Sequence, residues 1–225
     1  MIAINSLKEI DYELKDAFLH RYPHSGNIRM TGILFARPDS PLAKSEIIPS
    51  MPFFHQLSDN HIDFFCAGYG VQNRWDNDLD EEEEVGRIGG YLWKFSNRTF
   101  IDVYTEFERR TGLKYSGGVD LVLANAVFNR DTESGHLDFR STILCQLDQM
   151  KKDGAFPGVQ QFFMTIVRFS SSARNDDPTW GFSDQQGLRV AGSALKKVIL
   201  SLLPKKLADD YSKARHFVVV DGNAT

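Results

Sequence analysis

Two kinds of segment alternate along this chain from residue 28 almost to its end. Runs of β-branched and aromatic residues are followed by turn residues, and then by runs with the apolar period of a helix. This alternation is typical of an α/β domain, in which helices connect the strands of a sheet. We therefore expect a mixed or mostly parallel sheet of about five to six strands, with helices on both of its faces.

The predicted strands are short and continuously apolar or alternating, whereas the predicted helices are longer and carry one apolar stripe. Ser6, with Glu9 three residues later, predicts a capped start for the first helix. The predicted strands are 28–37, 62–67, 91–95, 119–128, 162–167 and 216–220. The predicted helices are 6–22, 44–57, 98–111, 140–152 and 187–203.

Two polar segments interrupt this alternation. Residues 69–90 contain seven carboxylates within the nine positions 76–84, and residues 170–186 form a second polar stretch. The first segment cannot bury enough apolar surface to hold one conformation alone. We expect a single domain over residues 1–225, with an acidic, mobile loop insertion at 69–90 and a polar loop at 170–186.

Charge and composition argue against two classes of partner. Lys and Arg (26) nearly balance Asp and Glu (30), and the formal charge of −4 argues against general nucleic-acid binding. No apolar stretch reaches the ~18 residues that a membrane span needs, and the first residues lack the apolar core of a signal peptide. We expect a cytoplasmic protein in which Cys66 and Cys145 are reduced and buried.

The first strand, turn, helix and second strand form a predicted βαβ unit. The turn at 37–41 reads Arg-Pro-Asp-Ser-Pro, and the helix contains Pro49. In outline this unit resembles the opening of thioredoxin-fold proteins, which implies a thioredoxin-like arrangement of these elements. Positions 41–44 read Pro-Leu-Ala-Lys where that family carries Cys-x-x-C, so no thiol–disulfide exchange is expected.

Active sites in open α/β sheets lie beyond the carboxyl ends of strands. One interpretation is a hydrolase or nucleotide-binding enzyme, in which a carboxylate holds Mg²⁺ or Ca²⁺ or acts as general base. Its catalytic residues would be Asp39, Asp120, His136 and Asp138. A buried Asp120 should have a polar partner, and a shifted pKa would make it a site candidate. The structural alternatives are a helix-capping turn at Asp39, an exposed strand face at Asp120 and a polar loop at 136–138.

The acidic insertion does not complete a calcium loop. Asp76, Asp78 and Asp80 alternate like the first ligands of an EF-hand, but Glu81 and Arg87 stand where that loop needs Gly and Glu. Loose Ca²⁺ or Mg²⁺ binding by this carboxylate cluster is one interpretation, and the favoured one is a solvated segment that repels anions and meets a basic partner.

The function that the sequence favours is non-catalytic. Phosphate-loop, dinucleotide-binding, nucleophile-elbow and zinc-helix motifs are all missing. Trp180 and Phe182 stand in a polar segment, where aromatic residues suit an interface, and Ser40 and Arg168 are placed to bind an anion after a strand. We expect a binding or assembly module with a protein partner or a second copy of itself, and no cofactor.

Overall fold

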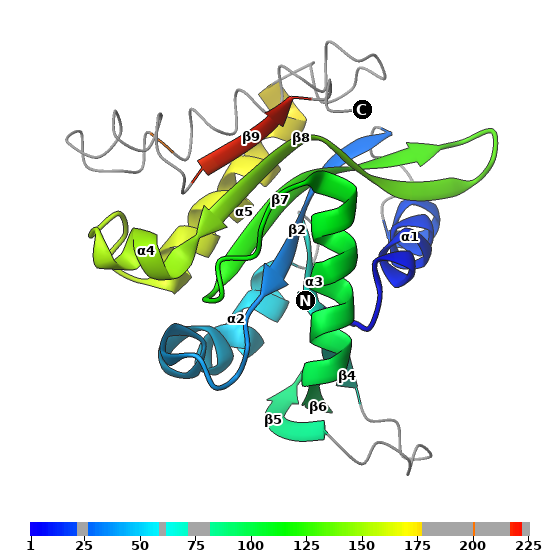
Figure 1. The fold of residues 1–225 in the computed structure, drawn as a ribbon. Helices are drawn as coiled ribbons and strands as arrows, with labels where there is room; N and C mark the ends of the chain where they lie inside the picture. The colour runs from blue at the N-terminus through cyan, green and yellow to red at the C-terminus, as the bar shows by residue number, and fades with distance from the viewer. Residues whose placement is uncertain (22–26, 59–61, 72–81, 177–199, 201–216, 222–225) are drawn as a thin grey trace.

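A mixed β-sheet forms the centre of the molecule (Figure 1). The computed structural model describes residues 1–21, 27–58, 62–71, 82–176, 200 and 217–221. Within this part of the chain the sheet has six strands in the order β1-β3-β2-β7-β8-β9, which confirms the predicted mixed sheet. The strands are β1 (Ile2–Ile4), β2 (Ile28–Phe35), β3 (Asp63–Ala67), β7 (Asp120–Asn129), β8 (Ser134–Gln146) and β9 (Phe217–Asp221).

The sheet is parallel on one side and antiparallel on the other. β1 and β2 both run parallel to β3, whereas β7, β8 and β9 continue the sheet from β2 in antiparallel order. The β2–β3 pair is joined through η2 (Ala43–Ile47) and α2 (Ile48–Ser58), which is the βαβ unit expected from the sequence. Its thioredoxin-like outline, and the covering of both sheet faces by helices, stay predictions.

A second sheet, of three strands, was not predicted. Its strands are β4 (Tyr69–Val71), β6 (Tyr91–Ser96) and β5 (Glu82–Ile88), antiparallel and in the order β4-β6-β5. We call it the small sheet; it lies at one end of the molecule, beside the start of α3 (Asn97–Thr111) (Figure 1). The segment expected to be a loop at 69–90 is therefore strand at both of its described ends, because both ends pair with the predicted strand at 91–95.

The capped start predicted for the first helix is confirmed, and α3 has a serine cap that was not predicted. In α1 (Leu7–Asp16) the Ser6 hydroxyl accepts from the Glu9 amide at 3.2 Å, and a single π-helical turn, η1 (Ala17–Arg21), follows. The N-cap of α3 is Ser96, whose hydroxyl accepts from the Thr99 amide at 3.3 Å. Gly112 ends α3 in a left-handed conformation (φ 72°), which glycine adopts without strain.

The strand predicted at 162–167 is wrong, because these residues lie within α5 (Val159–Asp176). Aromatic and β-branched residues made the run resemble a buried strand, yet its apolar positions also fit one face of a helix. That face packs through Phe163, whose ring stacks on Phe54 at 4.3 Å between centroids and contacts Phe64 at 5.0 Å. Tertiary packing therefore overrides the local strand preference.

The helix predicted at 140–152 is wrong in its first half. Residues up to Gln146 belong to β8, and α4 (Leu147–Lys152) supplies only the second half. The apolar residues Ile143 and Leu144 satisfy a helical spacing, but they pair with Leu123 and Val122 of β7. The polar residues that precede Ile143 form the turn between β7 and β8 and the first half of β8. Of the predicted helix at 187–203, only residue 200 is described, whereas the last predicted strand is confirmed as β9.

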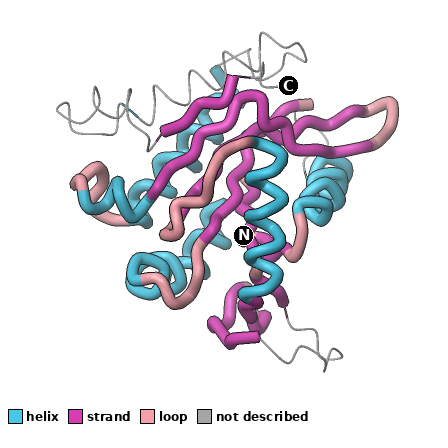
Figure 2. The backbone as a smooth tube through the Cα atoms, viewed as in Figure 1, coloured by secondary structure: helices cyan, strands magenta, loops and turns pink. Residues whose placement is uncertain are grey.

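The β7–β8 hairpin leaves the plane of the sheet partway along its length. Leu123 pairs with Ile143, but Asn125 pairs with Asp138, so β8 carries extra residues across a bulge. The Thr142 hydroxyl donates to the Phe139 carbonyl at 2.9 Å within it. Such a bulge bends the strand and increases its twist. Beyond it β7 still pairs with β2 as far as Val127, and the end of the hairpin extends past the sheet toward α1 as an arm (Figure 2).

Candidate functional site

The candidate site lies at the end of the main sheet where β2 and β8 end and β7 begins. In the sheet Phe35 pairs with Asp120, and Asp120 pairs with Gln146. Three connecting segments meet around these residues: the turn at 37–41, α4, and the loop 112–119 between α3 and β7. We call this loop the strap, because side chains from several elements hold it.

Asp120 is the central carboxylate of the site, and it is fully buried. One of its oxygens accepts from the Ser116 amide at 2.7 Å, and the other accepts from the Ser116 hydroxyl at 2.6 Å. The pKa of Asp120 is raised from 3.8 to about 6: burial is the main cause, the Ser116 hydrogen bonds oppose the rise, and the charge of Asp148 adds to it. The exposed strand face considered for this residue is therefore wrong, because its side chain is enclosed.

Asp148 supports the same loop from the first turn of α4. Its carboxylate accepts a hydrogen bond from the Val119 amide. A Cβ atom at Gly118 would lie 2.5 Å from the Asp148 carboxylate, so the close approach of strap and helix requires glycine at that position.

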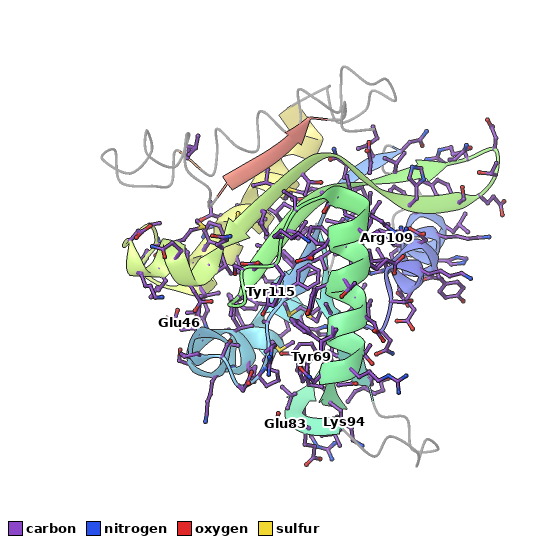
Figure 3. All side chains as sticks on the ribbon, viewed as in Figure 1. Glu46, Tyr69, Glu83, Lys94, Arg109 and Tyr115 are labelled. Atoms are coloured by element: carbon purple, nitrogen blue, oxygen red, sulfur yellow. The ribbon has the colours of Figure 1, made fainter. Side chains whose placement is uncertain are left out.

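Tyr115 fills the space between the strap and α3 (Figure 3). Its hydroxyl donates to the Gly118 carbonyl at 2.6 Å, and its ring contacts those of Phe35 and Phe100. Burial raises the pKa of Tyr115, and the charge of Asp120 raises it further, whereas Arg37 opposes the rise. Tyr115 is therefore a neutral hydrogen-bond donor at physiological pH.

Arg37 and Asp39 form an ion pair on the exposed side of the site. A guanidinium nitrogen of Arg37 lies 2.9 Å from the Asp39 carboxylate, and both side chains are more than a third exposed. The Ser40 hydroxyl donates to the Arg37 carbonyl at 3.0 Å, as expected of a turn that precedes a helix. The hydroxyl proposed to bind an anion thus donates within its own turn.

The four residues of the enzyme hypothesis do not come together. Asp39 and Asp120 lie at the same end of the sheet, since both act on the pKa of Tyr115. Asp138 pairs with Asn125 and His136 pairs with Val127, in the arm beyond the bulge. Val127 stands seven positions after Asp120 in β7, which is roughly 20 Å along a strand. Direct catalytic contacts need about 3 Å, so His136 cannot share one catalytic site with Asp120.

Of the three remaining predicted binding residues, the structure describes one. Arg168 is exposed on α5, whereas Trp180 and Phe182 lie outside the described residues. Within the described part of the chain, no group of three or more His, Cys, Asp or Glu residues could hold a metal ion. Mg²⁺ or Ca²⁺ binding therefore stays a prediction of the enzyme hypothesis.

Sequence reasoning missed three residues that build the site: Glu108, Tyr115 and Asp148. The predicted helix at 140–152 puts Asp148 well inside the helix. In the structure α4 begins at Leu147, so Asp148 stands in the first turn, where a carboxylate is favoured. The pair Gly117-Gly118 marked the turn but gave no indication of which acids hold it. Contacts between α3, β7 and α4 join residues that no local pattern connects.

No family model, no curated protein and no solved structure matches this chain. Among the described residues, no helix is both long and apolar enough to cross a membrane. Cys66 and Cys145 are free and buried, as expected. Burial raises the pKa of Cys66 to about 12 and also raises that of Cys145, so neither residue supplies a thiolate nucleophile.

Proposed function

We propose that this protein is a non-catalytic binding or assembly module that docks a basic protein partner on the small sheet. The observation that supports this function is the distribution of charge. Residues 69–96, which contain the three strands of the small sheet, hold seven acidic and three basic residues, a net charge of −4. The whole chain carries the same formal charge of −4, so the remaining residues balance. The excess negative charge is thus concentrated in one segment, where it can steer a basic partner.

The small sheet is held firmly against the body of the molecule. Tyr69, Trp93 and Phe95 are buried, and the Tyr69 hydroxyl donates to the Ala36 carbonyl at 2.7 Å. The ring of Phe95 also packs on that of Phe100 in α3, with centroids 5.5 Å apart. A rigid support of this kind lowers the entropy that its surface loses on binding.

The side chains of this sheet combine exposed charge with an exposed aromatic ring. Glu83 and Glu84 are exposed on β5, and Figure 3 shows Glu83 on this sheet together with Lys94 of β6. Tyr91 is 60% exposed at the start of β6. An exposed tyrosine on the same hairpin as exposed carboxylates is a suitable anchor for a Lys- and Arg-rich segment.

The edge of β5 argues for recognition through side chains rather than through strand addition. Its pairing with β6 shifts register between Glu84 and Gly86, which is a bulge. Charged side chains and bulges both discourage an edge from pairing with another chain. A partner that carries complementary charges fits this edge better than one that extends the sheet.

The test is binding of a fluorescein-labelled decalysine peptide, measured by anisotropy at several salt concentrations. We expect the double variant Glu83→Gln, Glu84→Gln to bind roughly fivefold more weakly, since each exposed charge pair contributes about 0.5 kcal/mol. The difference should disappear at high salt because exposed charges are screened. Tyr91→Ala should weaken binding by a salt-independent factor.

The matched control is Asp102→Asn with Asp131→Asn, which changes net charge equally at exposed acids of α3 and the β7–β8 turn. We expect this control to bind the peptide as the wild type does, apart from the long-range effect of net charge. Equal losses in the two double variants would overturn the proposal, because the position of the charges would then be irrelevant.

A carboxylate-dependent hydrolase is the second candidate function. The pKa of Asp120, raised to about 6, favours it because a general base works best with a pKa near the working pH. Its complete burial, and the engagement of both oxygens by Ser116, make it less favoured than the binding module. Turnover of p-nitrophenyl acetate or p-nitrophenyl phosphate, lost in both Asp120→Asn and Asp39→Asn, would favour it. If neither substrate is turned over across a full pH range, the result favours the binding module over the hydrolase.

A further inference from the structure

The two faces of the small sheet differ in composition, because side chains alternate between the faces along each strand. Val71 of β4 pairs with Trp93 of β6, and Tyr69 likewise stands opposite a residue of β6, Phe95. Residues that pair across antiparallel strands point to the same side, and so do residues two apart along one strand. Tyr91 therefore shares this side, two positions before Trp93. We call the side with these five residues the apolar face.

The apolar face is buried over most of its area but exposed at two side chains. Tyr69, Trp93 and Phe95 are at most 5% exposed, whereas Val71 is 40% and Tyr91 is 60% exposed. Val71 and Tyr91 are diagonal neighbours across β4 and β6, an arrangement in which the Cα atoms lie about 7–8 Å apart. The buried apolar surface thus continues into an exposed one made by two adjacent side chains.

β5 adds a carboxylate and an open space to the apolar face. Glu83 pairs with Phe95, which puts its side chain on this face. Burial raises the pKa of Tyr69, and the charge of Glu83 is among the groups that raise it further, as this placement requires. Gly86 pairs with Trp93, and a Cβ atom at Gly86 would meet no atom within 4 Å. The space beside Gly86 is therefore open to a side chain of a partner.

The opposite face of the small sheet carries cations that offset its acid. Glu84 pairs with Lys94 there, and Arg87 pairs with Leu92 on the same side. Among the side chains that the structure describes on the apolar face, Glu83 carries a charge and none belongs to Lys or Arg. A cation that approaches the apolar face therefore meets a carboxylate without a competing positive side chain.

We propose that the apolar face binds a basic, amphipathic segment of a partner protein, whose apolar side chain contacts Val71 and Tyr91 while a Lys or Arg side chain pairs with Glu83. This inference rests on the proposed function, and it adds which face of the small sheet binds and that the partner carries an apolar anchor. Glu83 stands opposite Phe95, four positions from Tyr91 along β6, which is roughly 13 Å. In an extended partner segment the cation should therefore stand about four residues from the apolar side chain.

Charge selects a basic partner over a second copy of this chain. Residues 69–96 carry a net charge of −4, so two small sheets that face each other would repel. An uncharged apolar segment would gain contact with the two exposed side chains alone. A basic segment gains the same contact and is also attracted to the surrounding acids, which favours it as the occupant of the apolar face.

The experiment compares two fluorescein-labelled peptides that carry equal charge and differ by one side chain. One peptide has a leucine between two runs of five lysines, and the other has a serine in its place. Anisotropy with the full chain should show about fivefold tighter binding of the leucine peptide, because part of its side chain leaves water. Val71→Ser should abolish this preference and leave the affinity for the serine peptide unchanged. Equal affinities of the two peptides for the wild type would overturn the inference.

Two exposed tyrosines provide a matched pair of variants. Tyr12 is 73% exposed on α1, away from the small sheet (Figure 1). Tyr91→Ser should lose the preference for the leucine peptide, and Tyr12→Ser should keep it. The same preference in both variants would contradict the inference, because the apolar contact would then lie elsewhere.

Glu83 and Glu84 provide a second matched pair, since they are adjacent in sequence and lie on opposite faces. Glu83→Gln should weaken binding of the leucine peptide about two- to threefold at low salt, and Glu84→Gln should weaken it less. If the two single variants lose affinity equally while the double variant still binds more weakly, the basic-partner function stands and the apolar face is wrong. If the double variant binds both peptides as the wild type does, the proposed function fails together with this inference.

Discussion

The end of the main sheet and the small sheet both present carboxylates, yet they use them in opposite ways. At the end of the main sheet, Asp120 is fully buried and accepts two hydrogen bonds from Ser116. On the small sheet, Glu83 and Glu84 are exposed to water. Burial makes an acid a short-range constraint on the backbone, whereas exposure makes it a long-range charge. The comparison teaches that an acidic residue acquires its role from its surroundings.

The two regions are also mechanically connected. Phe100 packs its ring against Phe35 of the main sheet, with centroids 6.1 Å apart, and against Phe95 of the small sheet at 5.5 Å. Gly68, between β3 and β4, allows this approach, because a Cβ there would lie 2.5 Å from the Cβ of Phe100. If this junction is essential, the two sheets should unfold together.

Breaking this connection should have the largest effect on stability. Phe100→Ala removes a ring that is 1% exposed, and such truncations cost about 3–5 kcal/mol. The measurement is urea unfolding, followed by tryptophan fluorescence and by circular dichroism. Ile101→Ala, at a neighbouring side chain that is 41% exposed, is the control and should cost under about 1 kcal/mol. Comparable losses would mean that the two sheets do not depend on this ring.

The next effect separates the buried carboxylate from the exposed ones by its pH dependence. Because the folded-state pKa of Asp120 is raised from 3.8 to about 6, its charged form destabilises the folded protein. Relative to Asp120→Asn, the wild type should lose about 3 kcal/mol of unfolding free energy as pH rises from about 4 to 7. Denaturant unfolding across this range measures the difference. If it stays constant, Asp120 titrates normally and the contrast with the small sheet fails.

A third carboxylate sharpens the comparison because it is neither fully buried nor fully exposed. Glu46 accepts from the Val159 amide at 2.9 Å and lies 3.1 Å from the Lys151 ammonium. These interactions lower its pKa, so its contribution is present above 4.5 and is lost as pH falls further. We expect Glu46→Gln to cost about 1 kcal/mol at pH 7. Thermal unfolding at pH 7 and pH 3 should show this cost shrinking in acid, the opposite of Asp120.

The smallest effect is expected on the small sheet. Glu83→Gln with Glu84→Gln should change stability by less than about 0.5 kcal/mol, since both side chains are exposed. Differential scanning calorimetry at low and high salt is the appropriate measurement. A large change in either direction would show that these charges support the fold rather than a partner.

The sequence predicted the elements whose signals are local. The capped helix at Ser6 and the parallel β2–β3 unit follow from spacing and turn residues that lie close together. The predictions fail where a contact with a residue distant in the sequence decides whether a run forms a strand or a helix. Phe162 and Phe163 fit either a strand or a helix until the contact of Phe163 with Phe54 selects the helix.

The candidate site was predictable only in part. Asp39 follows the carboxyl end of β2, as the rule requires, whereas Asp120 is the first residue of β7 and lies at the same end of the sheet because β7 runs antiparallel to β2. The prediction also included His136 and Asp138, which pair with Val127 and Asn125 farther along β7, because the sequence does not reveal how β8 pairs with β7. The burial of Asp120 depends on the packing of α3, α4 and the strap around it, and no single segment specifies that packing.

The anchoring of the strap has a consequence for protein engineering. Three of the side chains that hold this loop in its conformation lie outside it, at Glu108, Asp120 and Asp148. Transplanting residues 112–119 into another scaffold would therefore transfer their composition but not their conformation. Conversely, a foreign loop of equal length that keeps glycine at 118 should follow the original course here, as long as those three acids remain.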